Sequence, residues 1–240
     1  MEMNWKKFFT EKKIRALVFD FDGIIGDTEG LQMEKWNILL KPYGIKISLD
    51  EYAKKYCGKT STKEIPVLLK KEYGNRIPFT ADELGKKAGL ILKELFMIRD
   101  INLMPQAKKS ILFFISFKLA VCSGKNPEEL EMKLSSVGMN NIFPKNYRST
   151  QAEAGGLGKP HPAMYLLAVR RLGLTPAECV AFEDTSSGVK SAADAGLFVI
   201  AMPNAYSKGQ DFSRADVVIQ GGWPTFMEEV QNSFSKNQGN

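Results

Sequence analysis

The chain has 240 residues, of which 44% are hydrophobic and 25% are charged. This composition is ordinary for a globular protein and excludes a fibrous or low-complexity chain. The formal net charge is +6, but the basic residues are dispersed among acidic ones, so we expect no nucleic-acid partner.

The first predicted element is a buried strand over residues 14–19, an apolar run that ends at Asp20, Asp22 and Gly23. Alternate side chains of a strand share a face, so Asp20 and Asp22 should point the same way unless Gly23 turns the chain. Two close carboxylates repel unless a cation lies between them, and Mg²⁺ prefers oxygen ligands. One carboxylate could then attack while the other transfers a proton. A simple Asx turn is the alternative interpretation.

The next segment, residues 29–104, is predicted to be almost entirely helical. Ser48 with Glu51 and Thr80 with Glu83 predict capping boxes at two helix starts. Apolar side chains also recur at helical spacing in three places. They are Trp36, Leu39, Leu40 and Tyr43; Ile65, Leu68 and Leu69; and Leu84, Ala88, Ile91 and Leu95.

The position of this helical segment predicts two domains. Ligands bind at the carboxyl ends of parallel strands, and an insertion directly after the first strand would overhang that edge. We therefore expect a core domain of residues 1–28 and 105–240, and a helical cap domain of residues 29–104. Residues 57–62 of the cap would then govern specificity. The alternative is that the helices merely enlarge the core.

Four further apolar runs predict strands, at residues 117–123, 179–182, 198–202 and 216–219. Helical patterns lie between the last several of them. Strands that alternate with helices form a parallel sheet covered on both faces. We therefore expect an α/β fold with a doubly wound, Rossmann-like sheet.

Polar residues follow the second strand. Ser123 and Gly124 precede Asn126 and Pro127, which are typical of a helix start. A hydroxyl and free backbone N–H groups at such a point favour an anion such as phosphate. Taken alone, a Ser–Gly pair more often forms an ordinary turn.

A second polar cluster surrounds Lys159. Glycines before it and prolines on both sides of His161 predict a loop that ends in a helix beginning at Ala163. Lys159 could neutralise phosphate charge there, whereas a solvated loop lysine is the alternative. His161 is the single histidine, which excludes a Ser-His-Asp triad and a histidine metal cluster. We expect a structural or solvent-exposed role for it.

Glu183 and Asp184 end the third of these strands, next to a helix start at Thr185. Two adjacent carboxylates at another strand end repeat the chemistry of the first motif. Helix capping by Asp184 is the alternative.

The cysteines predict the compartment. Cys57, Cys122 and Cys179 are odd in number and lack CxxC spacing, which fits a reducing environment and offers no zinc site. The longest apolar stretch is interrupted by polar residues and is too short for a membrane span, and the N-terminus lacks the apolar core of a secretory signal. We expect a cytoplasmic monomer with no membrane partner.

The order of the four polar clusters closely resembles that of the haloacid dehalogenase-like hydrolase superfamily. More narrowly, the chain is similar to the phosphatase and β-phosphoglucomutase-like branch, whose members carry a helical cap. The resemblance covers residues 14–222. It also includes Asp27, Thr28 and Glu29, the run from Lys159 to Tyr165, the run from Glu183 to Gly188, and residues 192–196.

This resemblance implies catalytic and phosphate-binding roles. Asp20 would be the nucleophile that becomes an aspartyl phosphate, and Asp22 would act first as general acid and then as general base. Ser123, Gly124 and Lys159 would bind the phosphoryl oxygens.

The resemblance also implies a cofactor. Mg²⁺ would be bound by Asp20, by the backbone carbonyl of Asp22 and by Asp184, with Glu183 close by. The metal and the lysine would offset the repulsion between the nucleophile and a dianionic phosphate.

We therefore expect a Mg²⁺-dependent phosphatase that acts on a small phosphorylated metabolite, such as a sugar phosphate. One alternative is a β-phosphoglucomutase-like mutase, but the histidine that resembling mutases place on the first cap helix is Gln32 here. The other is a non-catalytic phosphate-binding module, which would be expected to lose Asp20, Asp22 or Asp184.

Overall fold

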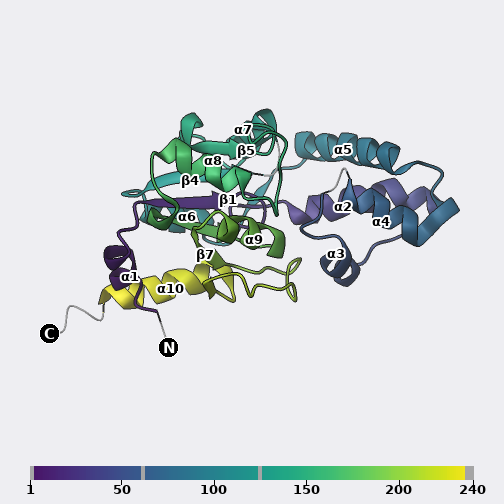
Figure 1. Cartoon of the computed structure of the whole chain (residues 1–240). Coiled ribbons are helices and arrows are strands. Elements are labelled where there is room, and N and C mark those ends of the chain that lie inside the picture. Colours follow the sequence, from purple (N-terminus) through teal and green to yellow (C-terminus); the bar gives the residue numbers. More distant parts are fainter. Residues whose placement is uncertain (1–2, 61–62, 124–125, 236–240) are drawn as a thin grey trace.

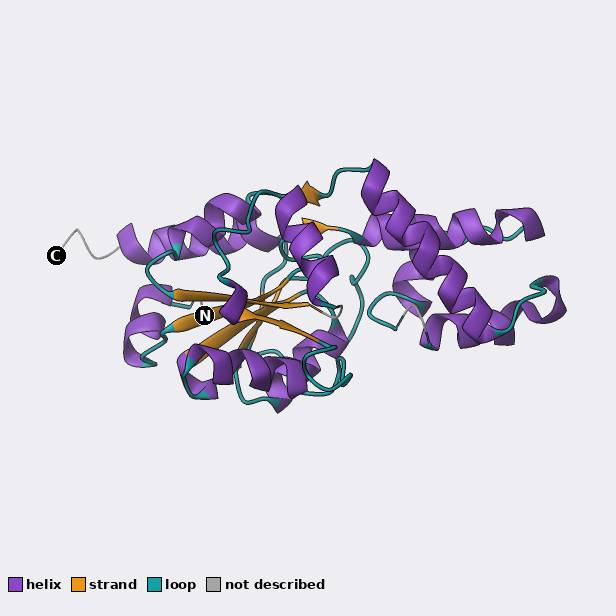
Figure 2. Ribbon diagram, turned by 90° about the horizontal axis from the view of Figure 1, so that it is seen from above, coloured by secondary structure: helices purple, strands orange, loops and turns teal. Residues whose placement is uncertain are grey.

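The computed structural model describes residues 3–60, 63–123 and 126–235, which form two lobes (Figure 1). The larger lobe is built on a six-stranded parallel sheet with the order β5-β4-β1-β6-β7-β8. Helices cover both faces of this sheet (Figure 2). The predicted doubly wound α/β fold is thus confirmed.

The elements of the larger lobe follow the predicted alternation. Its strands are β1 (Ala16–Asp20), β4 (Lys118–Ser123), β5 (Arg148–Thr150), β6 (Cys179–Glu183), β7 (Phe198–Ala201) and β8 (Val217–Val218). Its helices are α1 (Trp5–Glu11), α6 (Ala107–Phe113), α7 (Pro127–Ser136), α8 (Ala163–Leu172), α9 (Ser186–Asp194) and α10 (Gly222–Ser235).

Strand β1 lies at the centre of the sheet and separates two hydrophobic cores. Leu17 and Phe19 belong to the core shared with α1, α6, α7 and α10. Ala16 and Val18 belong to the core shared with α8 and α9. All five residues of the strand are buried, as expected for a strand covered on both faces. The period of two along β1 assigns Asp20 to the same face as Val18.

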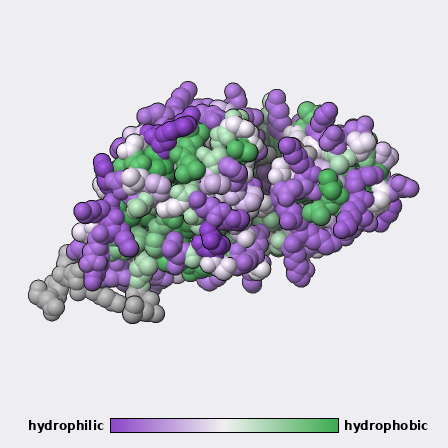
Figure 3. All heavy atoms as spheres, viewed as in Figure 1, coloured by the Kyte–Doolittle hydropathy of each residue, from purple (hydrophilic) through white to green (hydrophobic). Residues whose placement is uncertain are grey.

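The smaller lobe consists of α2 (Glu29–Leu40), α3 (Leu49–Lys55), α4 (Glu64–Tyr73) and α5 (Ala81–Ile98). These helices enclose a separate hydrophobic cluster that includes Trp36, Leu69 and Leu84. In the view of Figure 3, hydrophilic side chains cover most of this lobe's surface. The lobe therefore has its own core, which the predicted helical periodicity had indicated.

Of the two capping boxes predicted in the smaller lobe, one is present. Thr80 and Glu83 form a complete capping box at the start of α5. Ser48 caps α3 by accepting a bond from the Glu51 N–H, but the reciprocal bond is not made, so the predicted capping box there is wrong. The Glu51 carboxylate instead forms an ion pair with Lys55 on the next turn.

The chain passes between the lobes through a short antiparallel ribbon that the sequence analysis did not predict. Strand β2 (Gly26–Asp27) pairs with β3 (Asn102–Leu103). Strand β5 was also not predicted, because it is only three residues long and lacks an apolar run. Among the described residues, no helix combines the length and the apolar character that crossing a bilayer requires.

Candidate active site

Residues at the ends of β1, β5 and β6 and residues of the smaller lobe line one cavity of about 230 Å³. Strands β1, β4 and β6 are neighbours and run parallel, so the residues at their carboxyl ends meet at the same edge of the sheet. This is the edge at which open α/β sheets bind ligands. The lining residues include Asp20, Asp22, Gln151, Lys159 and Asp184 from the larger lobe, and Glu29, Gln32, Tyr52, Lys59, Thr60 and Ile65 from the smaller one.

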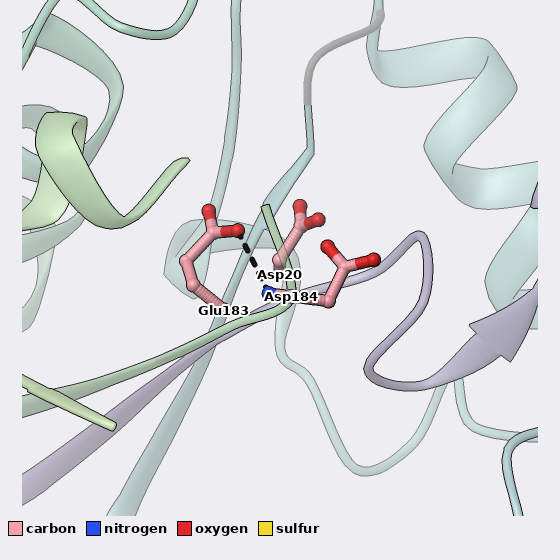
Figure 4. A group of neighbouring side chains, drawn as sticks. All are labelled: Asp20, Glu183 and Asp184. Carbon is pink, nitrogen blue, oxygen red and sulfur yellow. Dashed lines mark hydrogen bonds between the residues drawn. The ribbon is translucent and has the colours of Figure 1, made fainter. Parts of the chain in front are cut away.

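An acidic cluster lies at the ends of β1 and β6. Carboxylate oxygens of Asp20, Glu183 and Asp184 all lie within 4.8 Å of one another, and all three residues are buried (Figure 4). Gly23 permits this close approach, because a Cβ atom there would lie 2.0 Å from Asp184 Oδ2. Gly23 also adopts φ +80°, which favours glycine. The chain therefore turns at Gly23 with the acidic cluster packed against it.

The Asp22 carboxylate accepts hydrogen bonds from groups outside the acidic cluster. The Lys133 ammonium group donates to both Asp22 carboxylate oxygens, at 2.7 and 3.0 Å, and Thr28 Oγ1 donates to Asp22 Oδ1. Lys133 is fully buried on α7, and its Nζ also lies 3.3 Å from Glu129 Oε1. The chain turns at Gly23, as the sequence analysis allowed, and both Asp20 and Asp22 line the cavity.

Lys159 lies against the acidic cluster. Its Nζ is 2.7 Å from Asp20 Oδ1 and 2.5 Å from Glu183 Oε1, and its side chain is 13% exposed. A solvated loop lysine is therefore wrong for this position. The Tyr165 hydroxyl also donates to Glu183, which fixes that carboxylate from α8. A largely enclosed cation in contact with Asp20 lies where a phosphate charge would need neutralising.

Burial dominates the electrostatics of the cluster. It raises the pKa of Asp20 from 3.8 to about 8, although the neighbouring Lys159 acts in the opposite direction. Burial likewise holds the pKa of Asp184 well above its usual value, and the charges of Asp20 and Glu183 add to this effect. Burial alone would lower the pKa of Lys159, but the two carboxylates beside it hold that pKa well above its usual value. Additional positive charge would lower the free-energy cost of keeping these carboxylates ionised.

Two buried polar atoms in the site have no partner among the described residues. They are Asp184 Oδ1 and Ser123 Oγ. An orphaned buried carboxylate oxygen in a cluster of three carboxylates fits a hard divalent cation, which takes oxygen ligands. An orphaned hydroxyl at the end of β4 fits an anionic oxygen. Gly124, predicted to bind phosphate beside Ser123, lies outside the described residues.

The helix start after β6 leaves Asp184 available. Thr185 caps α9 by accepting from the Gly188 N–H, so capping by Asp184 is wrong. Gly188 is required there, because a Cβ atom would lie 2.0 Å from Glu183 Oε2. His161 is exposed, and its ring nitrogen accepts from the Ala163 N–H, in agreement with the predicted structural role.

The smaller lobe supplies polar groups to the opposite wall of the cavity. Glu29 accepts a hydrogen bond from the Tyr52 hydroxyl at 3.0 Å, and burial raises its pKa. Gln32 follows one turn later on α2, and its side-chain oxygen accepts from Lys35. Gly58, Lys59 and Thr60 of the predicted specificity segment line the cavity, whereas Ser61 and Thr62 lie outside the described residues.

Hydrogen bonds join this segment to the larger lobe. Ser187 Oγ donates to the Gly58 carbonyl at 3.1 Å, and Gln210 Nε2 donates to the Cys57 carbonyl at 3.3 Å. Gly58 has φ +78°, and a Cβ atom there would lie 3.4 Å from Thr185 Cβ. The two lobes are thus in direct contact across one side of the cavity.

Sequence reasoning missed two buried lysines of the site region, Lys133 and Lys35. Each carried a signal in the helical spacing. Lys133 occupies an apolar-face position on α7, between Leu130 and Leu134. Lys35 lies beside Trp36 on α2 and is almost fully buried. A lysine within an apolar stripe is expensive to bury unless it is paired, so its position indicates a nearby acceptor.

Comparison with known proteins gives a consistent result. The model of one family, described as haloacid dehalogenase-like hydrolase, matches residues 14–196. The protein CbbY of Rhodobacter capsulatus is 30% identical over 218 residues, which cover 85% of this chain and 92% of the relative. A phosphorylated carbohydrates phosphatase of Thermotoga maritima is 27% identical and covers 77% of this chain and 82% of its own length.

A solved structure shares the fold. The crystal structure of CbbY from Rhodobacter sphaeroides in complex with phosphate has a TM-score of 0.74 at 23% identity, and covers 91% of this chain and 99% of its own. The comparison therefore extends over both lobes.

Proposed function

Because the chain belongs to the haloacid dehalogenase-like hydrolase family, we propose that it is a Mg²⁺-dependent phosphatase acting on a small phosphorylated metabolite, with a sugar phosphate as the favoured class. The observation that carries the proposal is the buried cluster of Asp20, Glu183 and Asp184 beside Lys159. The names of the relatives, which include a phosphatase of phosphorylated carbohydrates, support the substrate class.

The proposed reaction has two steps. In the first, a carboxylate oxygen of Asp20 forms a bond to phosphorus, the ester bond to the leaving group breaks, and Asp22 protonates the departing oxygen. In the second, water attacks the aspartyl phosphate, Asp22 accepts the proton from that water, and inorganic phosphate leaves. Lys159 and the orphaned hydroxyl of Ser123 would bind the phosphoryl oxygens.

Mg²⁺ fits the donor set of the acidic cluster. The carboxylates of Asp20 and Asp184 and the backbone carbonyl of Asp22 would hold it, with Glu183 close by. Bound there, it would neutralise charge between the nucleophile and the phosphate. The orphaned Oδ1 of Asp184 supports this assignment.

The proposed organisation assigns residues 29–104 to a cap that covers the cavity and residues 1–28 and 105–240 to a catalytic core. The separate hydrophobic cluster of the smaller lobe supports this division. A closed cap would exclude bulk water from the reacting phosphate. We further propose a cytoplasmic monomer, in keeping with three unpaired cysteines.

The test uses p-nitrophenyl phosphate with and without Mg²⁺. We expect turnover that requires the metal, and a loss of at least about 10³-fold in Asp20→Asn, because the amide is not a nucleophile. Asp184→Ala should remove both the metal dependence and nearly all turnover. Equal rates for wild type and Asp20→Asn would overturn the assignment of the nucleophile. Binding of inorganic phosphate without any hydrolysis would instead favour a phosphate-binding module.

A further inference from the structure

Gln32 and Lys35 form a buried polar pair on α2, and Gln32 lines the cavity. Gln32 is 7% exposed and Lys35 is 1% exposed. Their spacing of three residues places both side chains on one side of the helix. The Lys35 ammonium group also lies 5.5 Å from the centre of the Trp36 ring. Burying two polar groups without hydrogen bonds is costly, so the hydrogen bond between Lys35 and Gln32 offsets part of that cost.

The chemistry of this contact fixes the orientation of the glutamine side chain. Lys35 Nζ donates to Gln32 Oε1. An ammonium group has three donors and no acceptor, so it can face the amide oxygen but not the amide nitrogen. The nitrogen of Gln32 must therefore point to the other side of the amide. Gln32 lines the cavity together with Asp20 and Asp22, so a molecule bound there can meet that nitrogen.

The positive charge of Lys35 also changes the strength of the amide as a donor. A cation at the carbonyl oxygen polarises the amide and strengthens its N–H groups as hydrogen-bond donors. One turn earlier, Glu29 presents carboxylate oxygens to the same cavity, with Oε2 accepting from Tyr52. A donor and an acceptor thus lie side by side on this wall. A hydroxyl group can satisfy both, because it accepts one hydrogen bond and donates another.

We propose that Lys35 locks the Gln32 amide so that its nitrogen serves as a specificity-determining donor to a hydroxyl oxygen of the leaving group, while Glu29 accepts from that hydroxyl. This inference rests on the proposed phosphatase function and assigns the part of the substrate that the phosphate site does not touch. Gln32 binds the leaving group directly, whereas Lys35 is a positioning residue that acts through Gln32.

The experiment compares phosphate monoesters that differ in hydroxyl content. Values of kcat/KM are measured for ribose 5-phosphate, glucose 6-phosphate, glycerol 3-phosphate and n-propyl phosphate, which has no hydroxyl group. The readout is the ratio between the best hydroxylated probe and n-propyl phosphate. We expect a wild-type ratio well above one, and a fall of about tenfold in Gln32→Glu, which replaces the donor with an acceptor, mainly through KM.

Lys35→Met tests whether Lys35 fixes the orientation of the Gln32 amide. Methionine keeps the length of the side chain but leaves the amide free to rotate, so the ratio should fall by about threefold, again through KM. Adding Lys35→Met to Gln32→Glu should cost nothing further in the ratio, because the donor is already lost. Lys41→Met, at an exposed position directly after α2, is the matched control and should keep the wild-type ratio.

The outcomes distinguish this inference from the proposed function. If p-nitrophenyl phosphate is hydrolysed and Asp20→Asn is inactive, the phosphatase assignment stands whatever the ratios are. A wild-type enzyme that hydrolyses n-propyl phosphate as well as every hydroxylated probe would overturn the inference alone. The inference would also be overturned if the variants of Gln32 and Lys35 lowered kcat/KM equally for all substrates, since that result indicates a purely structural pair. Unfolding midpoints of each variant show whether it is folded.

Discussion

Replacing Asp22 with alanine should lower the free energy of unfolding by about 2–4 kcal/mol, because it removes the main counterion of a buried lysine. Lys133 is fully buried, and Asp22 accepts two hydrogen bonds from its ammonium group. Breaking a buried ion pair by removing one partner typically costs about 3–5 kcal/mol. The cost should be lower here because Glu129 remains 3.3 Å away and retains 20% exposure of its side chain.

The same reasoning predicts that a second substitution restores stability. Lys133→Met removes the buried charge, while its stem still packs between the rings of Phe21 and Phe96, each 5.5 Å from the ammonium group. We expect the Asp22→Ala, Lys133→Met double variant to lie within about 1 kcal/mol of wild type. For a chain of this size the loss in Asp22→Ala corresponds to a fall in Tm of about 4–16 °C.

Urea unfolding followed by circular dichroism, with metal chelated, gives the four free energies of this cycle. Thr28→Val is the matched control, because it removes only the hydroxyl that donates to Asp22 and should cost about 1 kcal/mol. The reasoning is refuted if Asp22→Ala is as stable as wild type. It is equally refuted if the two substitutions destabilise additively, since the lysine would then not depend on the carboxylate.

Three further predictions concern the metal, the close packing of the site and the fate of the aspartyl phosphate. Burial raises the pKa of Asp20 to about 8. Between about pH 4 and pH 8 the metal-free folded state therefore holds a proton that the unfolded chain releases, so the free energy of unfolding should fall as pH rises through that window. Mg²⁺ should accordingly raise Tm more at about pH 8 than at about pH 6. An equal effect of Mg²⁺ at both values would contradict this. Gly188→Ala should lower the urea midpoint strongly, because its Cβ would lie 2.0 Å from Glu183 Oε2, whereas Gly89→Ala, with nothing within 4 Å on the exposed side of α5, should raise stability by up to about 1 kcal/mol. The same midpoint for both glycine variants would show that the contact is easily relieved. Finally, because Gln32 cannot relay a proton, β-glucose 1-phosphate with a trace of the 1,6-bisphosphate and Mg²⁺ should yield inorganic phosphate or no product; sustained formation of glucose 6-phosphate, followed by a coupled dehydrogenase assay, would favour a mutase.

The strand ends were predictable because their signals are local. The apolar runs before Asp20 and Glu183 indicate buried strands, and the turn residues after them indicate where those strands stop. Parallel strands then bring these ends to one edge without further information. Lys159 could be placed for the same reason, since prolines fix the start of the helix that follows it.

The remaining parts of the site depend on contacts distant in sequence. Lys133 and Asp22 are 111 residues apart, and only the packing of α7 against the turn after β1 brings them together. Asp22 lies beyond the end of β1, where the period of two along a strand no longer describes the side-chain direction. Strand β5 is recognisable only through its pairing with β4, since Arg148, Ser149 and Thr150 carry no apolar pattern.

The paired crossing between the lobes has an evolutionary consequence. Gly26 lies opposite Leu103 and Asp27 lies opposite Asn102 in the β2–β3 ribbon. Paired Cα atoms in such a ribbon are about 4.5–5.5 Å apart, so the chain leaves the sheet and returns to it through neighbouring residues. Any helical unit whose ends meet at that spacing could replace α2–α5, and even a tight turn could close the gap, without shifting the register of β1 against β4. Descendants of such a gene could therefore acquire new substrates by exchanging one contiguous segment, while the catalytic edge of the sheet is inherited unchanged.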